Sequence, residues 1–199
     1  MKKLILVATA VFMVCIAKAQ LSSGNFAYGV KGGWNVTNVS NAEAKNKMSI
    51  HLGAFAEWRL NDYFGIQPEL LYSRQGFRDK YDWDGKKVKA KCRINYLNIP
   101  VLAKLYVLEG LSVDLGPQFG FALNVKEKIK YDGHTSKNKI KSFNTFDFSF
   151  AVGASYSIDD FILSARYNIG LTDIFDKWDE NNKNHVFQLS VGYCLNNLF

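Results

Sequence analysis

The 199-residue sequence contains few of the residues that build disulfide scaffolds, metal centres or transmembrane helices. It has three cysteines and three histidines, and only Cys92 and Cys194 follow the N-terminal leader described below. Two cysteines are too few for a disulfide framework. His51, His134 and His185 are scattered and match no metal-ligand spacing. Beyond the leader, no apolar run approaches the roughly 20 residues that a membrane-spanning helix needs.

The start of the chain has the composition of a secretory signal peptide. Two lysines precede an apolar run over 4–16, and an Ala-Lys-Ala cleavage signal ends at Ala19. We therefore assign residues 1–19 to a cleavable signal peptide and residues 20–199 to one mature domain. Without the three lysines of the leader, the mature chain has 22 basic and 18 acidic residues, a net charge of +4.

Large apolar residues recur at every second position after residue 26, which is the period of a β-strand. Although 48% of the residues are apolar, the mean hydropathy is only −0.12, because polar residues fill the alternate positions. Eight such runs are each long enough for about ten residues to cross a bilayer at a tilt. They lie near residues 26–36, 50–60, 64–72, 97–107, 111–125, 146–158, 161–171 and 187–195. Three prolines within them, at 68, 100 and 117, are expected to mark bulges.

Short and long connections alternate between these runs. The short ones are the two-residue turns Asn61-Asp62, Glu109-Gly110 and Asp159-Asp160, and the long polar ones lie near 38–48, 75–91, 126–142 and 172–184. This alternation is typical of an up-and-down outer-membrane barrel, with short turns in the periplasm and long loops outside the cell.

Side-chain volume decides which face of the strands points outward. The apolar face carries many Phe, Tyr, Trp and Leu residues, whereas the other face is rich in Gly, Ala and Ser. The interior of an eight-stranded barrel is only just filled by side chains, so the bulky face cannot fit inside. The predicted fold is therefore all-β, an eight-stranded antiparallel up-and-down transmembrane β-barrel whose apolar face contacts lipid.

The face that then points inward carries charges of balanced sign. They are Lys31, Glu57, Arg59, Glu69, Lys104, Asp114, Asp147 and Arg166. Buried charges persist only when they are paired and hydrogen-bonded. We predict that these residues form a network that plugs the lumen. An ion or proton path is the alternative, which the narrow interior of eight strands disfavours.

Several segments resemble the PorT-like outer-membrane β-barrel family. They are YGVKGGWNVTN from Tyr28, LGAFAEWRLNDYFGIQPELLYSRQGF from Leu52, NYLNIPVLAKLYV from Asn95, GLSVDLGPQFGF from Gly110, LSARYNIGLTDIF from Leu163 and FQLSVGYCL from Phe187. The resemblance covers essentially the whole mature chain and implies an outer-membrane barrel with a periplasmic N-terminus. The family is named after a component of a protein-secretion system, but fold alone does not transfer that function. The final Phe199 resembles the terminal aromatic that the barrel-assembly machinery reads.

Catalysis would require a nucleophile, a base and an orienting group on one face. His51 points inward, His134 lies at a loop tip and His185 precedes an outward register, so the three histidines share no face. His51 with Ser73 or Glu69 is the one arrangement of a base that the sequence allows, and a hydrogen-bonded lumen histidine is the simpler interpretation. No phosphate-cradling glycine loop or nucleic-acid motif is present. We therefore expect no enzyme, no cofactor, no metal and no nucleic-acid partner.

Two of the long connections carry basic residues at alternate positions. In the first, a lipid-facing register would place a ladder of cations at the height of lipopolysaccharide phosphates: Arg74, Arg78, Lys80, Lys87, Lys89, Lys91 and Arg93. In the second, an inward register would gather a cluster over the barrel mouth, suited to an anionic partner: Lys126, Lys128, Lys130, Lys137, Lys139 and Lys141. A bulge in either hairpin would exchange these faces. A solvated, charged rim is the alternative.

The sequence thus predicts a protein of the cell outer membrane with a structural or interaction role and no catalytic turnover. The expected partners are outer-membrane lipid and lipopolysaccharide, the barrel-assembly machinery during biogenesis, and proteins that bind the extracellular loops. A component of a secretion or assembly complex, a narrow porin-like channel and a lipid-modifying barrel enzyme are the alternatives.

Overall fold

The computed structural model describes residues 26–39, 47–76, 78–83, 86–131, 134–139, 144–173 and 183–196. Its elements are the strands β1 (Phe26–Val39), β2 (Lys47–Arg59), β3 (Phe64–Gln75), β4 (Arg78–Trp83), β5 (Lys86–Leu108), β6 (Leu111–Tyr131), β7 (His134–Lys139), β8 (Phe146–Ile158), β9 (Phe161–Gly170) and β10 (Asn184–Cys194). Within these ranges no helix is long and apolar enough to cross a membrane.

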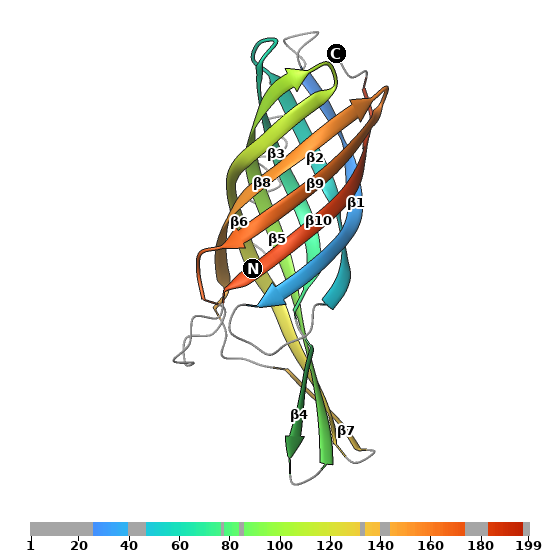
Figure 1. The fold of residues 1–199 in the computed structure, drawn as a ribbon, viewed down its shortest axis with the longest axis vertical. Coiled ribbons are helices and arrows are strands. Elements are labelled where there is room, and N and C mark those ends of the chain that lie inside the picture. The colour runs from blue at the N-terminus through green and yellow to red at the C-terminus, as the bar shows by residue number, and fades with distance from the viewer. Residues whose placement is uncertain are drawn as a thin grey trace.

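Eight of the ten strands close into an antiparallel barrel (Figure 1). The ring runs through β1, β2, β3, β5, β6, β8, β9 and β10, and β10 pairs with β1 again. Following the paired residues once around the ring from Tyr106 leads to Tyr96 on the same strand, a stagger of ten residues. Such a stagger tilts the strands and leaves an interior that side chains just fill. The predicted eight-stranded barrel is confirmed.

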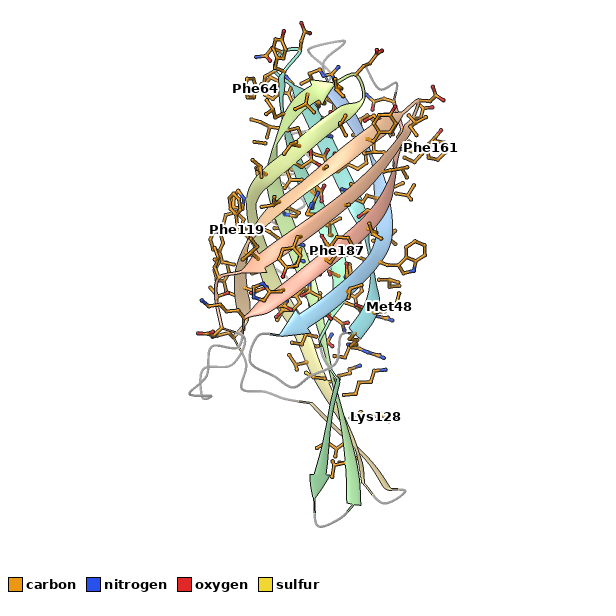
Figure 2. All side chains as sticks on the ribbon, in the orientation of Figure 1. Met48, Phe64, Phe119, Lys128, Phe161 and Phe187 are labelled. Atoms are coloured by element: carbon orange, nitrogen blue, oxygen red, sulfur yellow. The ribbon has the colours of Figure 1, made fainter. Side chains whose placement is uncertain are left out.

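The apolar face of the strands points outward, as predicted from its volume. Along β9, exposed and buried residues alternate without a break, with Phe161 and Leu163 outside and Ile162 and Arg166 inside. Figure 2 shows Phe64 on the outside of the barrel near one end. The exposed side chains around the ring are mostly Leu, Val, Ile, Phe, Tyr and Trp. A surface of this composition is stable against lipid rather than water.

Three short connections lie together at one end of the barrel (Figure 1). The side chain of Asn61 accepts hydrogen bonds from the backbone N–H groups of Tyr63 and Phe64, both at 2.9 Å. Gly110 and Asp159 adopt positive φ values of 75° and 49°, as tight hairpin turns require. We call this end the short-turn end, and the opposite end the long-loop end.

Two hairpins continue the sheet past the long-loop end. The strands β5 and β6 extend beyond the ring, pair with each other, and pair with β4 and β7 respectively. The result is a four-stranded extension in the order β4-β5-β6-β7, which projects from the barrel (Figure 1). The segments 75–91 and 126–142, predicted as long polar connections, are therefore largely strands.

The ladder between β5 and β6 contains the two register shifts of the described sheet. Tyr96 pairs with Ala122, but the preceding Asn95 pairs with Asn124, so that Leu123 is an extra residue in β6. The second shift lies between residues 106 and 108, near the short-turn end. The prediction that the prolines mark bulges is wrong, because neither shift lies at a proline. The bulge at Leu123 sets the orientation of everything beyond it.

Candidate functional site

Glu69 on β3 is the centre of a buried ion-pair network in the lumen. Its carboxylate accepts two hydrogen bonds from the guanidinium of Arg166 on β9, at 2.8 and 2.9 Å. Lys31 on β1 adds a third, from Nζ to Oε1 at 2.8 Å. The side chain of Gln67 donates a fourth at 2.6 Å. One carboxylate thus joins three strands that lie far apart in the sequence.

Gln67 connects this cluster to a second ion pair. The Nζ of Lys104 donates to Gln67 Oε1 at 3.0 Å and to Glu57 Oε2 at 2.8 Å. The hydroxyl of Tyr106 donates to the other oxygen of Glu57, and the guanidinium of Arg59 lies 4.1 Å from the centre of the Tyr106 ring. Six of the predicted lumen charges therefore lie in one connected network: Lys31, Glu57, Arg59, Glu69, Lys104 and Arg166. Gln67 and Tyr106 occupy inward positions, but the alternating pattern does not predict that they link the charges.

The two remaining predicted lumen charges have neutral partners. Asp114 accepts hydrogen bonds from the hydroxyls of Ser112, at 2.8 Å, and Ser155. Asp147 accepts one from the hydroxyl of Thr172 at 3.1 Å. In the part of the chain that the structure describes, neither carboxylate forms an ion pair with a lysine or arginine. The prediction that these two aspartates join the ion-pair network is therefore wrong.

His51 on β2 is held by hydrogen bonds to side chains of β1 and β10. Its Nδ1 lies 2.7 Å from Asn35 Oδ1, and its Nε2 lies 2.8 Å from Ser190 Oγ. Because the amide nitrogen of Asn35 donates to Ser73 Oγ and to the carbonyl of Arg74, its oxygen accepts from the histidine. Nδ1 therefore carries the proton, and Nε2 accepts from the serine hydroxyl.

The partners of His51 differ from those that the sequence suggested. Ser73 reaches the ring only through Asn35, and Glu69 belongs to the ion-pair network. Catalytic triads likewise place a histidine between a nucleophile and an orienting residue. The residues on either side of Ser190 in β10 are exposed on the outer face of the barrel, so Ser190 points into the lumen. The arrangement joins three strands of the wall.

The bulge at Leu123 overturns the predicted orientation of the second basic cluster. Ala122 and Val125 are both buried, so the strand after the bulge has the opposite phase from the strand before it. Lys126 is consequently exposed and pairs opposite the exposed Arg93. The prediction that Lys126, Lys128, Lys130, Lys137 and Lys139 cluster over the barrel mouth is therefore wrong, and Lys141 lies outside the described residues.

Strand register joins the two basic clusters on one face of the four-stranded extension. One row across the strands is Arg78, Lys91, Lys128 and Lys137, and its neighbours are Arg93, Lys126 and Lys139 on one side and Lys80, Lys89 and Lys130 on the other. We call this surface the cationic face. By strand register it comprises twelve positions: Arg74, Arg78, Lys80, Lys87, Lys89, Lys91, Arg93, Lys126, Lys128, Lys130, Lys137 and Lys139. Neighbouring strands are about 4.8 Å apart and rows are about 7 Å apart, so these positions are closely spaced along the backbone.

The cationic face begins directly at the edge of the apolar belt. The last apolar row at this position is Tyr72, Leu97 and Phe121, which pair across three strands. Arg74 lies two residues after Tyr72 on the same outer face of β3, and it is exposed. Figure 2 shows Lys128 farther out, on the extension beyond the barrel. The first cations therefore lie where an apolar belt gives way to water, and the others lie farther from it.

A closed ring of eight staggered strands with an apolar outside and a polar, charged inside defines the class of outer-membrane β-barrels. The chain belongs to the family described as outer membrane protein beta-barrel domain, whose model matches residues 18–176. No curated protein matches the sequence.

Solved structures with the same architecture include two small barrels. Ail, the attachment invasion locus protein of Yersinia pestis, is 13% identical with a TM-score of 0.51, covering 86% of this chain and 100% of its own. Neisserial surface protein A is 13% identical with a TM-score of 0.50, covering 85% and 97%. Ail has also been crystallised with the heparin analogue sucrose octasulfate, at 14% identity and a TM-score of 0.49, covering 86% and 100%. At these identities the similarity shows the fold alone.

Proposed function

We propose that this protein is a pore-less outer-membrane barrel that binds lipopolysaccharide phosphates through its cationic face, and acts by binding rather than by catalytic turnover. The observation that carries the proposal is the Leu123 bulge, which gathers the cations of two hairpins on one outward face. Lysine and arginine both form charge-assisted hydrogen bonds to phosphate. In this proposal the long-loop end faces the outside of the cell, as in other barrels of this class.

The height of the cationic face favours a lipid-bound anion over a free one. Arg74, Arg93 and Lys126 are exposed within two steps of the last apolar row. Lipid phosphates lie at that level, immediately above the hydrocarbon. Since the face continues outward by several rows, it also suits an anion that extends away from the membrane, as the phosphorylated sugars of lipopolysaccharide do.

Removing four charges from the cationic face should weaken lipopolysaccharide binding. The variant carries Arg74→Gln, Arg93→Gln, Lys126→Gln and Lys128→Gln. If each contact contributes about 0.5 kcal/mol, as exposed ion pairs do, the variant should bind roughly thirtyfold more weakly. Binding is measured as lipopolysaccharide retained by the purified barrel in low salt, where such contacts are least screened.

A charge-matched control separates a local effect from a general one. It removes four lysines at sequence positions other than the twelve of the cationic face, namely Lys45, Lys86, Lys177 and Lys183. The control should retain lipopolysaccharide like the unmodified protein. If both variants lose lipopolysaccharide equally, the effect is one of net charge alone. If the first variant retains as much lipopolysaccharide as the unmodified protein, the cationic face is only a solvated rim.

We also propose that the lumen is closed to ions. The ion-pair network crosses the interior from β1 and β9 through β3 to β5 and β2. In a barrel of eight strands, side chains are just sufficient to fill the interior. Planar-bilayer recordings of the refolded protein should therefore show no steady conductance of porin scale, beside a sixteen-stranded porin as the positive control. A stable open channel would contradict a closed lumen.

A role in a secretion or assembly complex is a second candidate, in keeping with the PorT-like resemblance. The feature that favours it is the pair of sheet edges on the extension. Among the described strands, β4 pairs only with β5, and β7 pairs only with β6. An open edge can accept a strand of another protein. A protein that co-purifies stoichiometrically from gently solubilised membranes would support this candidate.

A further inference from the structure

Asp147 is a lumen carboxylate that forms no ion pair with a lysine or arginine of the described residues. It lies one residue into β8, at the long-loop end, and is 6% exposed. Its partners are neutral, since it accepts hydrogen bonds from the side chains of Thr172 and Asn184. The row of Asp114, by contrast, contains Lys104 and Arg166. A buried charge without a counter-charge is costly.

Two amide side chains near Asp147 have polar atoms without hydrogen-bond partners. Asn98 is 1% exposed, and neither its Oδ1 nor its Nδ2 has a partner. Gln118 is 2% exposed; its Nε2 donates to Ser149 Oγ at 3.0 Å, but its Oε1 has no partner. Buried polar atoms are almost always satisfied, so each exception indicates a bound water, an ion or a strained site.

Gly120 brings these groups together. It pairs with Asn98 on one side and with Asp147 on the other. A Cβ atom at Gly120 would lie 3.1 Å from Asn98 Oδ1 and 3.2 Å from the Cβ of Asp147. The missing side chain therefore leaves space beside the Asn98 amide oxygen and the Cβ of Asp147. Gln118 lies two residues before Gly120, on the same inward face.

We propose that this part of the lumen binds a hard cation of the Ca²⁺ class, with the Asp147 carboxylate and the amide oxygens of Asn98 and Gln118 as protein ligands. Carboxylate and amide oxygens are the ligands that such cations prefer, and water completes their shell. The described residues contain no group of three His, Cys, Asp or Glu side chains that could hold a metal ion, so amide oxygens must supply the remaining ligands. With one carboxylate, the affinity falls in the weak range of extracellular calcium modules, with Kd about 10⁻⁴–10⁻³ M.

The test uses the whole mature barrel, refolded in detergent without lipopolysaccharide, so that lipid phosphates cannot bind the metal. Millimolar CaCl₂ should raise the thermal unfolding midpoint, whereas KCl at equal ionic strength should not. Tb³⁺, a hard oxygen-seeking substitute for Ca²⁺, should give tyrosine-sensitised luminescence. Tyr96 is a suitable donor, since it is buried two residues before Asn98 on the same strand face. Added Ca²⁺ should displace the Tb³⁺ signal.

Variants locate the site. Asp147→Asn should weaken Ca²⁺ binding by roughly tenfold or more, because ligand charge sets affinity. Asn98→Ala should also weaken it while the carboxylate stays in place, and it decides the matter if Asp147→Asn fails to refold. Asp160→Asn, at the short-turn end, should bind like the unmodified protein. Tb³⁺ luminescence unchanged in both lumen variants, or an unfolding midpoint that responds equally to CaCl₂ and KCl, would overturn the proposal. Neither result depends on the cationic face.

Discussion

Replacing Glu69 by glutamine should destabilise the barrel by roughly 3–5 kcal/mol, the usual cost of breaking a buried ion pair by removing one partner. Glutamine keeps the shape of the side chain but removes the charge that Arg166 and Lys31 share. Two buried cations would then face each other without a counter-charge. The free energy of unfolding is measured by equilibrium urea denaturation in lipid vesicles, followed by tryptophan fluorescence.

Two further variants test the cause of this effect. Replacing Lys31, Glu69 and Arg166 together by methionine should recover much of the lost stability, because an apolar substitute for a complete buried ion pair is often neutral or stabilising. Asp160→Asn at the short-turn end should change the free energy of unfolding by less than about 0.5 kcal/mol. A Glu69→Gln variant as stable as the unmodified protein would mean that the ion pairs do not hold the lumen together.

The second large effect is expected at Gly33, where the first and last strands of the ring meet. A Cβ atom at this position would lie 1.9 Å from the carbonyl oxygen of Leu189 and 2.7 Å from the Cα of Ser190. Both obstacles are backbone, so one strand must move for alanine to fit. Overpacking of this kind costs about 1–3 kcal/mol and occasionally more. Gly33→Ala should therefore lower the fraction of protein that refolds to the heat-modifiable form on a gel.

Gly192 provides the matched control on the same seam. It pairs with Lys31, and the nearest atoms to its Cβ position are side-chain carbons of Phe55 and Ile162, at 3.3 and 3.5 Å. These contacts are close to ordinary packing, so Gly192→Ala should refold nearly as well as the unmodified protein. If both alanine variants refold equally, the close approach at Gly33 does not control closure of the ring.

The fold was predictable because its two determinants are local and repetitive. A period of two marks each strand, as in β9, where every second residue from Phe161 is exposed. Volume then assigns the faces, since an eight-stranded interior has no room for the aromatic side. Neither the period nor the side-chain volume depends on which strand neighbours which. The short turns were equally predictable, because residues such as Gly110 favour the backbone conformation that a tight turn requires.

The site was less predictable because it depends on features that pattern does not encode. One inserted residue, Leu123, moved a whole basic cluster to the other face, although nothing in its own identity distinguishes it from its neighbours. The inward charges were found by their alternation, but their partners were not. Glu69 and Arg166 are 97 positions apart, and the stagger of the ring determines that they meet.

The ring closes between the strands that are made first and last, and this has a consequence for the order of assembly. Beyond the β1–β10 ladder, the backbone of Tyr28 donates to the side chain of Asn196, which in turn donates to the carbonyl of Phe26. Ser190, the partner of His51, also belongs to the final strand. Until that strand arrives, the other seven form a sheet with two open edges and an incomplete polar interior, which lipid cannot satisfy. The ring and its polar interior are therefore complete only once the C-terminal strand has docked.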